Sequence, residues 1–401
     1  MSSARDQHGV AVPMAVLSAL ILSTVVAGFA TLSAIEPVVA GNQLRVAQAR
    51  AIAEAGVERA LWALSNPADA QGIPQVFSTA PAPYDGSRLI PVEVGGHIIG
   101  GFRVTVRNGA APYERDISAV GWAPSDTAPH PRALQKISVT AINPRLIVKD
   151  PPAALSAGGD LTAGGTLVVD ALSDQSCGRK VGTVSLGETR VLPAATSIRG
   201  SADGNEVKNQ VTDAGGGGMP AAAGDLVTHV SRASLEAFAL SPADLNSLRG
   251  VARTRGTYLK GPVSFDAVNR MPDGVVFVDA AADGAPESST VRVDGPASSD
   301  ATGPWSGWLI VDGSLSLRGD TRMKGFVHAE RALGIPTGSA IALSGAAIGR
   351  GGAEWSTAGL VAETGGDLSI VYDCNDVRTG GGKVPGRWAR KAGTYREVSG
   401  S

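Results

Sequence analysis

The spacing of hydrophobic and polar residues changes along the chain and separates an N-terminal helical part from a longer β-rich part. Residues 10–35 contain no charged side chain, and this run exceeds the ~20 apolar residues that a helix needs to cross a bilayer. Residues 41–64 keep a helical period, with apolar side chains recurring at steps of three and four. The pattern predicts one long helix over residues 10–65, with a transmembrane part at 10–36 and an amphipathic continuation at 37–66.

Two questions about this helix are whether its apolar segment is cleaved off and where the helix bends and ends. Small residues at 38–40 precede Gly41 and are typical of a secretory cleavage site, but the apolar run is longer than the roughly 7 to 15 residues of a signal peptide, so we favour retention of the segment. Pro37 could bend the helix, and Asn66-Pro67 is expected to end it. An ordinary helix packed on its own domain is a compatible interpretation of the second half.

Residues 88–142 alternate apolar and polar side chains with a period of two. The clearest strands are at 102–107, 117–122 and 137–142, separated by clusters of Gly, Pro and Asn. Packed against the amphipathic helix, an antiparallel meander of these strands would form an α+β head over residues 67–150. Asn143-Pro144 and residues 150–152 mark its boundary.

Residues 151–379 contain many short alternating strands that end in glycine turns. Three of these strands have a large apolar residue at an equivalent place: Leu315, Ile341 and Leu368. The sequence distance from Leu315 to Ile341 nearly equals the distance from Ile341 to Leu368. This spacing predicts a β-helix or solenoid-like domain, with a β-sandwich as the alternative. A helix is expected near 231–252, with Ser241-Pro242 capping its second half, and a flexible loop at 215–218.

Composition narrows the functional classes. The 401 residues carry a formal net charge of -2, so no global field favours nucleic acid. With 43% hydrophobic and 18% charged residues the chain can bury a large core, and its length predicts two or three units. Two cysteines are too few for a disulfide scaffold or a zinc module.

The sequence lacks the common catalytic motifs of hydrolases, metalloproteases, redox dithiols and nucleotide-binding loops. Residues 380–383 are similar to part of a phosphate loop, but Val384 cannot supply the hydroxyl that binds magnesium, so a flexible linker is favoured. The acid pairs Asp279 with Asp283 and Asp373 with Asp376 could serve glycosidic chemistry, although acids at turns are usually solvated or cap the backbone. We expect no enzyme, no cofactor and no metal site. A surface or structural role is expected for His8, His97, His130, His229 and His328.

If the part of the chain after the transmembrane segment is exported, Cys177 and Cys374 both lie outside the cytoplasm, where thiols can pair. A bridge between them would stabilise the fold by about 4 to 5 kcal/mol on the chain-entropy model. Two buried free thiols are the alternative, and the sequence does not decide between a bridge and free thiols.

The basic tail at residues 380–401 interleaves cations with Trp388 and Tyr395. It could contact DNA or an acidic surface, but we favour a solvated terminus.

The N-terminal part of the chain, as far as Ser65, resembles a type IV prepilin, specifically the PilX-like minor pilin family, with relatives among the type II secretion pseudopilins. The resemblance rests on a short polar leader ending at Gly9, the apolar run GVAVPMAVLSALILSTVVAGFATL and the small-residue stretch AQARAIAEAGVERALWAL. It implies cleavage of the leader 1–9 by a prepilin peptidase, a mature chain beginning at Val10 and methylation of its amine. Most pilins carry glutamate at the fifth mature position, where this chain has Met14, and this difference is similar to tip pseudopilins.

The resemblance implies a single-pass protein of the inner membrane, with a cytoplasmic N-terminus and the C-terminal region in the periplasm or outside the cell. Its partners would be other pilins or pseudopilins, bound through the N-terminal helix. The expected function is that of a minor pilin or pseudopilin involved in filament assembly, at or near the tip. The alternatives are a membrane-tethered β-helical carbohydrate-binding protein or hydrolase, and a DNA-capturing pilus subunit.

Overall fold

The computed structural model divides the chain into two compact units. The first comprises Met1–Arg107, Asp116–Val139 and Thr394–Ser401, and the second comprises Asn108–Arg115 and Thr140–Gly393. The structure describes residues 11–124, 133–163, 165–187, 189–191, 196–200, 211–213, 226–227, 236, 239–280, 289–295, 303–351 and 366–399.

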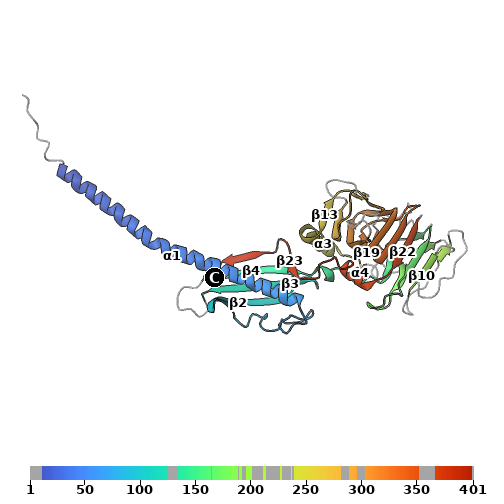
Figure 1. Cartoon of the computed structure of the whole chain (residues 1–401), viewed down its shortest axis with the longest axis horizontal. Coiled ribbons are helices and arrows are strands. Elements are labelled where there is room, and N and C mark those ends of the chain that lie inside the picture. The colour runs from blue at the N-terminus through green and yellow to red at the C-terminus, as the bar shows by residue number, and fades with distance from the viewer. Residues whose placement is uncertain are drawn as a thin grey trace, which may run out of the picture. The chain divides into compact units, whose positions relative to one another are not determined.

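The predicted long helix is present as α1, Ala11–Ser65, and it continues through Pro37 (Figure 1). It ends directly before Asn66-Pro67, where the Asn66 amide group donates to the carbonyl of Trp62. Proline at position 67 cannot continue the helical hydrogen bonds, so the end of the helix is set locally. By length and composition, Val12–Ser65 can cross a membrane.

The three strands predicted after α1 are confirmed as members of one antiparallel sheet. They are β2 (His97–Asn108), β3 (Glu114–Ala123) and β4 (Ala133–Ile142), and a further strand, β1 (Ile90–Val94), pairs with β2. Gly95 and Gly96 connect β1 to β2 with φ angles of 59° and 79°, which suit glycine in a two-residue hairpin turn.

The second half of α1 packs on this sheet through small side chains (Figure 1). The predicted stripe is buried from Ala49 onward, whereas Val46 is exposed. Glycine permits the close approach of helix and sheet, because a Cβ on Gly121 would meet the backbone oxygen of Ala49 and a Cβ on Gly56 would lie 2.9 Å from the Phe102 ring. The buried positions of the stripe are Ala49, Ala53, Val57, Ala60 and Leu64.

The C-terminal residues return to the same sheet, so strand pairing holds residues 389–399, although most of their described side chains are exposed. β23 (Ala389–Arg390) pairs with the end of β4, and β24 (Arg396–Ser399) pairs with its first half. The open edge of β4 accounts for this, because its unpaired backbone groups gain partners. In chain order, the whole β-rich region is therefore inserted between two strands that pair with one another.

The β-rich region forms parallel sheets. The strands β13, β15, β17, β19, β21, β22, β7 and β10 lie side by side in the largest sheet, and β5, β8 and β12 join it. The strands of the main row are β13 (Thr257–Lys260), β15 (Gly274–Asp279), β17 (Trp305–Asp312), β19 (Asp320–Ala329), β21 (Ala340–Gly349), β22 (Asp367–Val371), β7 (Leu167–Asp170) and β10 (Thr196–Arg199). The three strands that join it are β5 (Ala153–Ala157), β8 (Val181–Ser185) and β12 (Leu226–Val227).

Two smaller parallel sheets accompany it. The four-stranded sheet contains β14 (Ser264–Phe265), β16 (Thr290–Asp294), β18 (Ser314–Arg318) and β20 (Leu333–Gly334). The three-stranded sheet contains β6 (Leu161–Ala163), β9 (Thr189–Val191) and β11 (Val211–Asp213). Because β-sandwiches are built from antiparallel sheets, the parallel pairing argues against that alternative.

One predicted register is confirmed and another is wrong. Ile341 pairs with Leu368 on adjacent strands, as their spacing predicts. Leu315 instead pairs with Leu333 in the four-stranded sheet, so its similar spacing from Ile341 is not a structural repeat. Apolar and polar side chains alternate with the same period in every strand, so this alternation cannot show to which sheet a strand belongs.

The second half of the helix predicted near 231–252 is observed as α3, Pro242–Arg255, which begins at the predicted cap and ends later than predicted, whereas most of the first half lies outside the described residues. Ser241 and Asp244 form a capping box, and Pro242 occupies the first turn, so the helix starts where its cap allows. Its apolar side chains Leu248 and Val251 are buried with Trp308 and Phe326 in the core of the second unit.

The described part of this unit also contains two short helical segments, a 3₁₀ turn at Pro144–Leu146 and α4 at Cys374–Thr379. The loop predicted at 215–218 lies outside the described residues.

Candidate functional site

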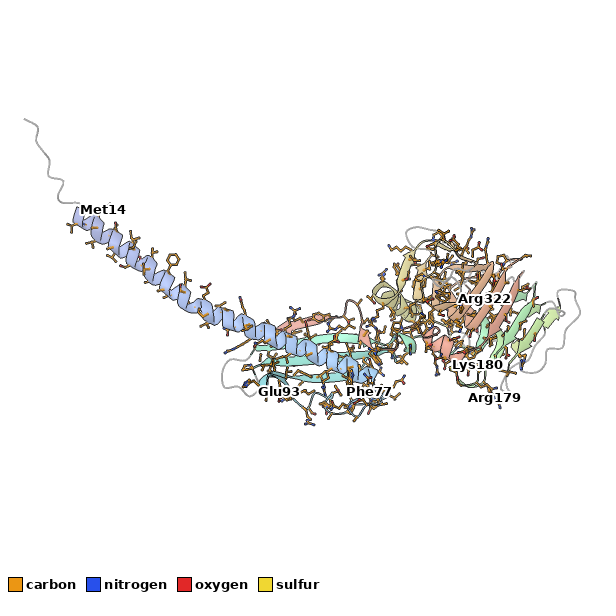
Figure 2. All side chains as sticks on the ribbon, in the orientation of Figure 1. Met14, Phe77, Glu93, Arg179, Lys180 and Arg322 are labelled. Carbon is orange, nitrogen blue, oxygen red and sulfur yellow. A yellow bond between two sulfur atoms is a disulfide. The ribbon has the colours of Figure 1, made fainter. Side chains whose placement is uncertain are left out.

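The first half of α1 presents apolar side chains around its whole circumference. Met14 is 59% exposed, and large hydrophobic side chains from Val12 to Val46 are exposed in the same way (Figure 2). The exposed large hydrophobic residues are Val12, Met14, Val16, Leu17, Leu20, Ile21, Leu22, Val25, Val26, Phe29, Leu32, Ile35, Val38, Val39, Leu44 and Val46. A continuous apolar surface of this size requires a lipid or protein cover. The cleavage residues Gly9 and Val10 lie outside the described residues.

Three hydroxyl groups within this apolar segment hydrogen-bond to their own helix. Ser23 Oγ donates to the carbonyl of Ala19 at 2.7 Å, and Thr24 and Thr31 donate to carbonyls three and four residues earlier. A polar group without a partner costs several kcal/mol in hydrocarbon, so these internal bonds make the segment compatible with a lipid environment.

Polar contacts join the C-terminal strand to the amphipathic half of α1. Tyr395 Oη donates to Glu54 Oε1 at 3.2 Å, and Arg50 Nε lies 3.5 Å from Glu397 Oε2. These groups are at least partly exposed, so each contact contributes little to stability by itself. Together with the pairing of β24, they place residues 394–399 within the head.

The aromatic and cationic groups of the basic tail are engaged within the fold. Trp388 is 7% exposed, and the Arg115 guanidinium lies 5.1 Å from the centre of its ring. Lys391 Nζ lies 2.6 Å from Glu114 Oε1, and Lys383 Nζ lies 3.4 Å from Asp273. An indole that is buried in this way cannot stack on the bases of a single strand, which is the contact that the DNA-binding alternative would need.

The segment expected to be a flexible linker caps α4 and packs on the large sheet. Gly380 takes the left-handed conformation that ends α4, with a φ of 56°. Four glycines in register on adjacent strands leave room for this end of the helix, because a Cβ on Gly325 would lie 3.1 Å from the Cα of Gly380. The four glycines are Gly274, Gly307, Gly325 and Gly345.

Side chains of the sheet hold α4 on this row of glycines. Trp308 Nε1 donates to the carbonyl of Val377 at 2.7 Å, and Ser344 Oγ donates to Asp376 Oδ2 at 2.6 Å. Burial raises the pKa of Asp376, which the Ser344 hydroxyl partly opposes. Asp373 caps the first turn of α4 by accepting from the Asp376 amide. The acid pair Asp373 with Asp376 is thus used in capping and packing.

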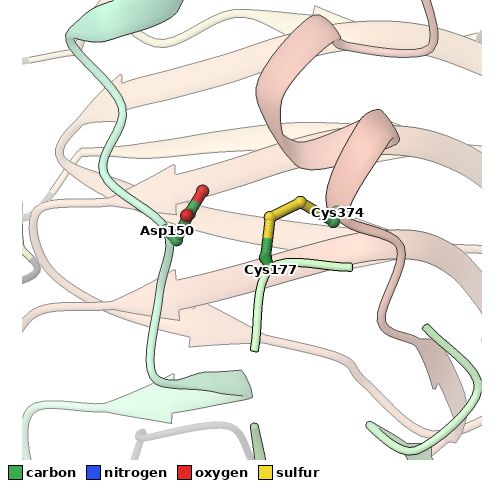
Figure 3. Close-up of side chains that lie close together, drawn as sticks. All are labelled: Asp150, Cys177 and Cys374. Atoms are coloured by element: carbon green, nitrogen blue, oxygen red, sulfur yellow. A yellow bond between two sulfur atoms is a disulfide. The ribbon is translucent and has the colours of Figure 1, made fainter. Parts of the chain in front are cut away.

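The two cysteines meet at the start of α4. Cys177, in the loop after β7, is joined to Cys374 with a Cα to Cα distance of 5.8 Å, and Asp150 lies beside the pair (Figure 3). Arg378 donates to both carboxylate oxygens of Asp150, at 2.9 and 2.6 Å. Asp174 Oδ2 accepts the backbone N–H of Cys374 at 2.7 Å. Asp150 and its neighbours were missed at the sequence level because they come from separate segments.

Two further buried polar side chains lie close in sequence to the two cysteines. Tyr372 is fully buried, and its hydroxyl has no hydrogen-bond partner among the described residues. Burial raises the pKa of this phenol, and the charge of Asp150 raises it further. Lys180 is 8% exposed, and its Nζ lies 5.7 Å from the centre of the Tyr372 ring. Burial lowers the pKa of Lys180, although the charge of Asp150 acts in the opposite direction.

A second cluster of charges lies where α3 covers the large sheet. Asp279 and Asp312 are register partners on β15 and β17, and Arg249 from α3 reaches both. Arg249 Nη2 lies 2.9 Å from Asp312 Oδ2, and its guanidinium lies 5.0 Å from the centre of the Phe277 ring. Burial and the neighbouring Asp279 raise the pKa of Asp312, which Arg249 partly counteracts. The other member of the predicted pair, Asp283, lies outside the described residues.

His328 belongs to a buried network on the neighbouring strands. Its Nε2 lies 2.7 Å from Glu330 Oε1, and Arg350 Nη1 donates to Glu330 Oε2 at 2.9 Å. Burial pushes the pKa of Glu330 upward, but the contacts with His328 and Arg350 outweigh burial and hold it below its ordinary value. His97 lies exposed on β2, and the other three histidines lie outside the described residues.

A cavity of about 130 Å³ adjoins α3 and β23. Apolar side chains including Ile142 and Val251 line it together with Arg255, Arg390 and Lys391, and no carboxylate is among its lining residues.

The comparisons with known proteins include a solved structure that is similar to this chain. No protein-family profile matches the sequence, and no curated protein matches it. A crystal structure of the competence-associated pilin ComZ from Thermus thermophilus is similar over 88% of this chain and 98% of that chain, with 11% identity and a TM-score of 0.24. A likeness with that TM-score carries no functional argument, so the functional argument rests on the chain's own features.

Proposed function

We propose that this chain is a minor pilin or pseudopilin-like subunit of a type IV pilus or type II secretion filament, and that its activity is assembly. The observation that carries the proposal is the division of α1 into two halves. The first half exposes apolar side chains from Val12 to Val46, and the second half is buried on an antiparallel sheet from Ala49 onward. A single helix can therefore serve as a membrane anchor before assembly and as a packing rod within a filament.

The apolar half supplies the driving force in both settings. Lipid covers these side chains in the inner membrane, and equivalent helices of neighbouring subunits would cover them in a filament. Met14 stands where a glutamate would pair with the neighbouring subunit's N-terminal amine in most pilins. A thioether cannot form that ion pair, so a subunit with Met14 suits the first position, at or near the tip.

The β-rich region would form the displayed part of such a subunit. We infer that its three parallel sheets are the faces of a β-helix, with successive strands as its coils. The parallel registers from β13 through β22 support this inference, because a solenoid stacks each strand on the equivalent strand of the next coil. The chain leaves β4 to enter this region and returns to the end of β4 through β23.

The proposed topology is a single pass with the N-terminus in the cytoplasm and the second unit exported. The leader 1–9 would be removed by a prepilin peptidase between Gly9 and Val10, and the new amine would be methylated. Export places Cys177 and Cys374 in an oxidising compartment, which is compatible with their juxtaposition.

Mass spectrometry of the mature N-terminus tests the proposal. The wild-type chain is expected to begin at a methylated Val10, whereas Gly9→Ala should retain the leader and remain in the membrane without entering filaments. Gly41→Ala is the matched control, because a Cβ at Gly41 has no neighbouring atom within 4 Å. A mature chain beginning at Gly41, or filament entry by an uncleaved Gly9→Ala chain, would overturn the proposal.

A further inference from the structure

Asp150, Cys177 and Cys374 bring three metal-binding atoms together from three segments of the chain. The carboxylate oxygen and the two sulfur atoms all lie within 4.8 Å of one another. Figure 3 shows Asp150 beside the pair of sulfurs. We propose that reduction of the bridge converts this cluster into a binding site for a thiophilic divalent cation such as Zn²⁺ or Cd²⁺.

The geometry of the cysteines suits both states. A Cα to Cα distance of 5.8 Å lies within the range of a disulfide. Tetrahedral coordination at ~2.3 Å per thiolate requires the sulfurs to be ~3.7 Å apart, which side-chain rotation can supply from the same backbone positions. Asp150 would provide a third ligand, and three protein ligands leave the fourth position of a tetrahedral cation open to water.

Neighbouring groups support the ligands. Arg378 holds Asp150 by two hydrogen bonds, but a carboxylate offers about four lone-pair sites, so oxygen lone pairs remain for a cation. Asp174 fixes the backbone of Cys374 through its 2.7 Å hydrogen bond. Contacts of this kind orient the ligands of metal sites, and their loss commonly weakens binding about 10- to 100-fold.

The hydroxyl of Tyr372 provides an independent indication of a ligand. The residue is fully buried, and its hydroxyl has no hydrogen-bond partner within the described parts of the chain. Tyr372 precedes Cys374 by two positions in the chain, and both residues belong to the same buried core. Buried polar groups are rarely unpaired, and a water molecule on the open position of the cation would supply the missing partner.

Reduction and binding conserve atoms and electrons. A phosphine such as tris(carboxyethyl)phosphine donates two electrons to the S–S bond and becomes the phosphine oxide with oxygen from water, while two protons complete the thiols. Binding of the cation then releases both thiol protons to the buffer. Reoxidation by an added disulfide transfers two electrons to that disulfide, reforms the bridge and releases the cation.

The test uses the full chain in detergent, reduced with the phosphine and desalted without oxygen. Cd²⁺ is added while the ultraviolet charge-transfer band from thiolate to cadmium is recorded. We expect saturation at one Cd²⁺ per chain, displacement by excess Zn²⁺ and no band in the oxidised protein. Cys177→Ser should abolish the saturable band.

Asp150→Asn separates a preformed site from a flexible pair of thiols. It should weaken Cd²⁺ binding by about 10-fold or more, because it removes a charged ligand. The matched control is Asp320→Asn, which changes an exposed carboxylate on β19 and should leave the affinity unchanged. Tyr372→Phe removes only the hydroxyl and should weaken binding several-fold.

Two results would overturn the proposal. The first is the absence of a saturable band in the reduced chain. The second is a band whose affinity is the same in wild type and Asp150→Asn, as expected if reduction merely unfolds the region and frees the thiols. Circular dichroism of the reduced chain identifies the second case directly. Neither result depends on filament assembly.

Discussion

Lys391 Nζ lies 2.6 Å from Glu114 Oε1, although 277 positions separate the two residues. Glu114 opens β3 and is 6% exposed, and Lys391 directly follows β23. The returning C-terminal segment therefore supplies a cation to a carboxylate that the sheet buries.

Replacing this lysine should destabilise the fold. Lys391→Ala leaves Glu114 buried without its cation, and we expect the free energy of unfolding to fall by about 1 to 3 kcal/mol. This loss is smaller than the full cost of breaking a buried ion pair, because Lys391 is itself 37% exposed. Denaturant unfolding in detergent measures it. Lys383→Ala, which loses a more exposed pair, is the control and should change stability by less than about 1 kcal/mol. Equal effects of the two substitutions would contradict this prediction.

The contact between α1 and the sheet depends on a glycine. Gly121→Ala places a methyl group against the backbone of Ala49 and Ala53, neither of which can move without shifting the helix. We expect a loss of about 1 to 3 kcal/mol in unfolding free energy, the usual cost of overpacking. Gly41→Ala lies in an uncrowded part of the same helix and should be neutral or stabilising. If Gly121→Ala unfolds like wild type, helix and sheet are not in close contact.

The Glu330 network predicts a defined pH dependence. Its contacts with His328 and Arg350 hold the pKa of Glu330 below the ordinary value of 4.5, so the folded state binds its proton less readily than the unfolded state. The resulting stability is present above pH 4.5 and is lost as the pH falls through the folded pKa. The difference in stability between wild type and Glu330→Gln should therefore shrink on acidification. A difference that grows below that pH would contradict the assignment.

Arg249 should couple α3 to the sheet. Arg249→Lys keeps the charge but cannot reach Asp279 and Asp312 together with a planar fork, and it loses the contact with Phe277. We expect faster amide exchange across α3 and a loss of about 1 kcal/mol, since these ion pairs are partly exposed. Arg255→Lys, an exposed position in the last turn of the same helix, is the control. Unchanged exchange in Arg249→Lys would show that apolar packing alone holds α3.

The bridge between Cys177 and Cys374 should be visible in the isolated protein. Its reduction should slow migration on a denaturing gel, because the bridge closes a loop with a sequence separation of 197. The double change to serine should lower the unfolding free energy by about 4 to 5 kcal/mol on the chain-entropy model. Identical migration with and without reductant would show that the cysteines are free.

Local patterns predicted the elements whose determinants are close in sequence. Residues 10–65 had the length and period of a spanning and packing helix, and Asn66-Pro67 ended it at Ser65. Ser241 marked the start of α3 because a cap bonds only to its own first turn. The predicted strands at 102–107, 117–122 and 137–142 are present because alternation reflects one buried face.

Only the tertiary structure shows which distant segments of the chain contact one another. Leu315 and Ile341 share a pattern but lie in different sheets, and nothing in the tail indicated that β23 and β24 would pair with β4. The cluster of Asp150 with the cysteines is likewise assembled from three segments. Periodicity and capping report interactions within a few residues, whereas the choice of partner strand and the meeting of side chains depend on which distant surfaces bury one another.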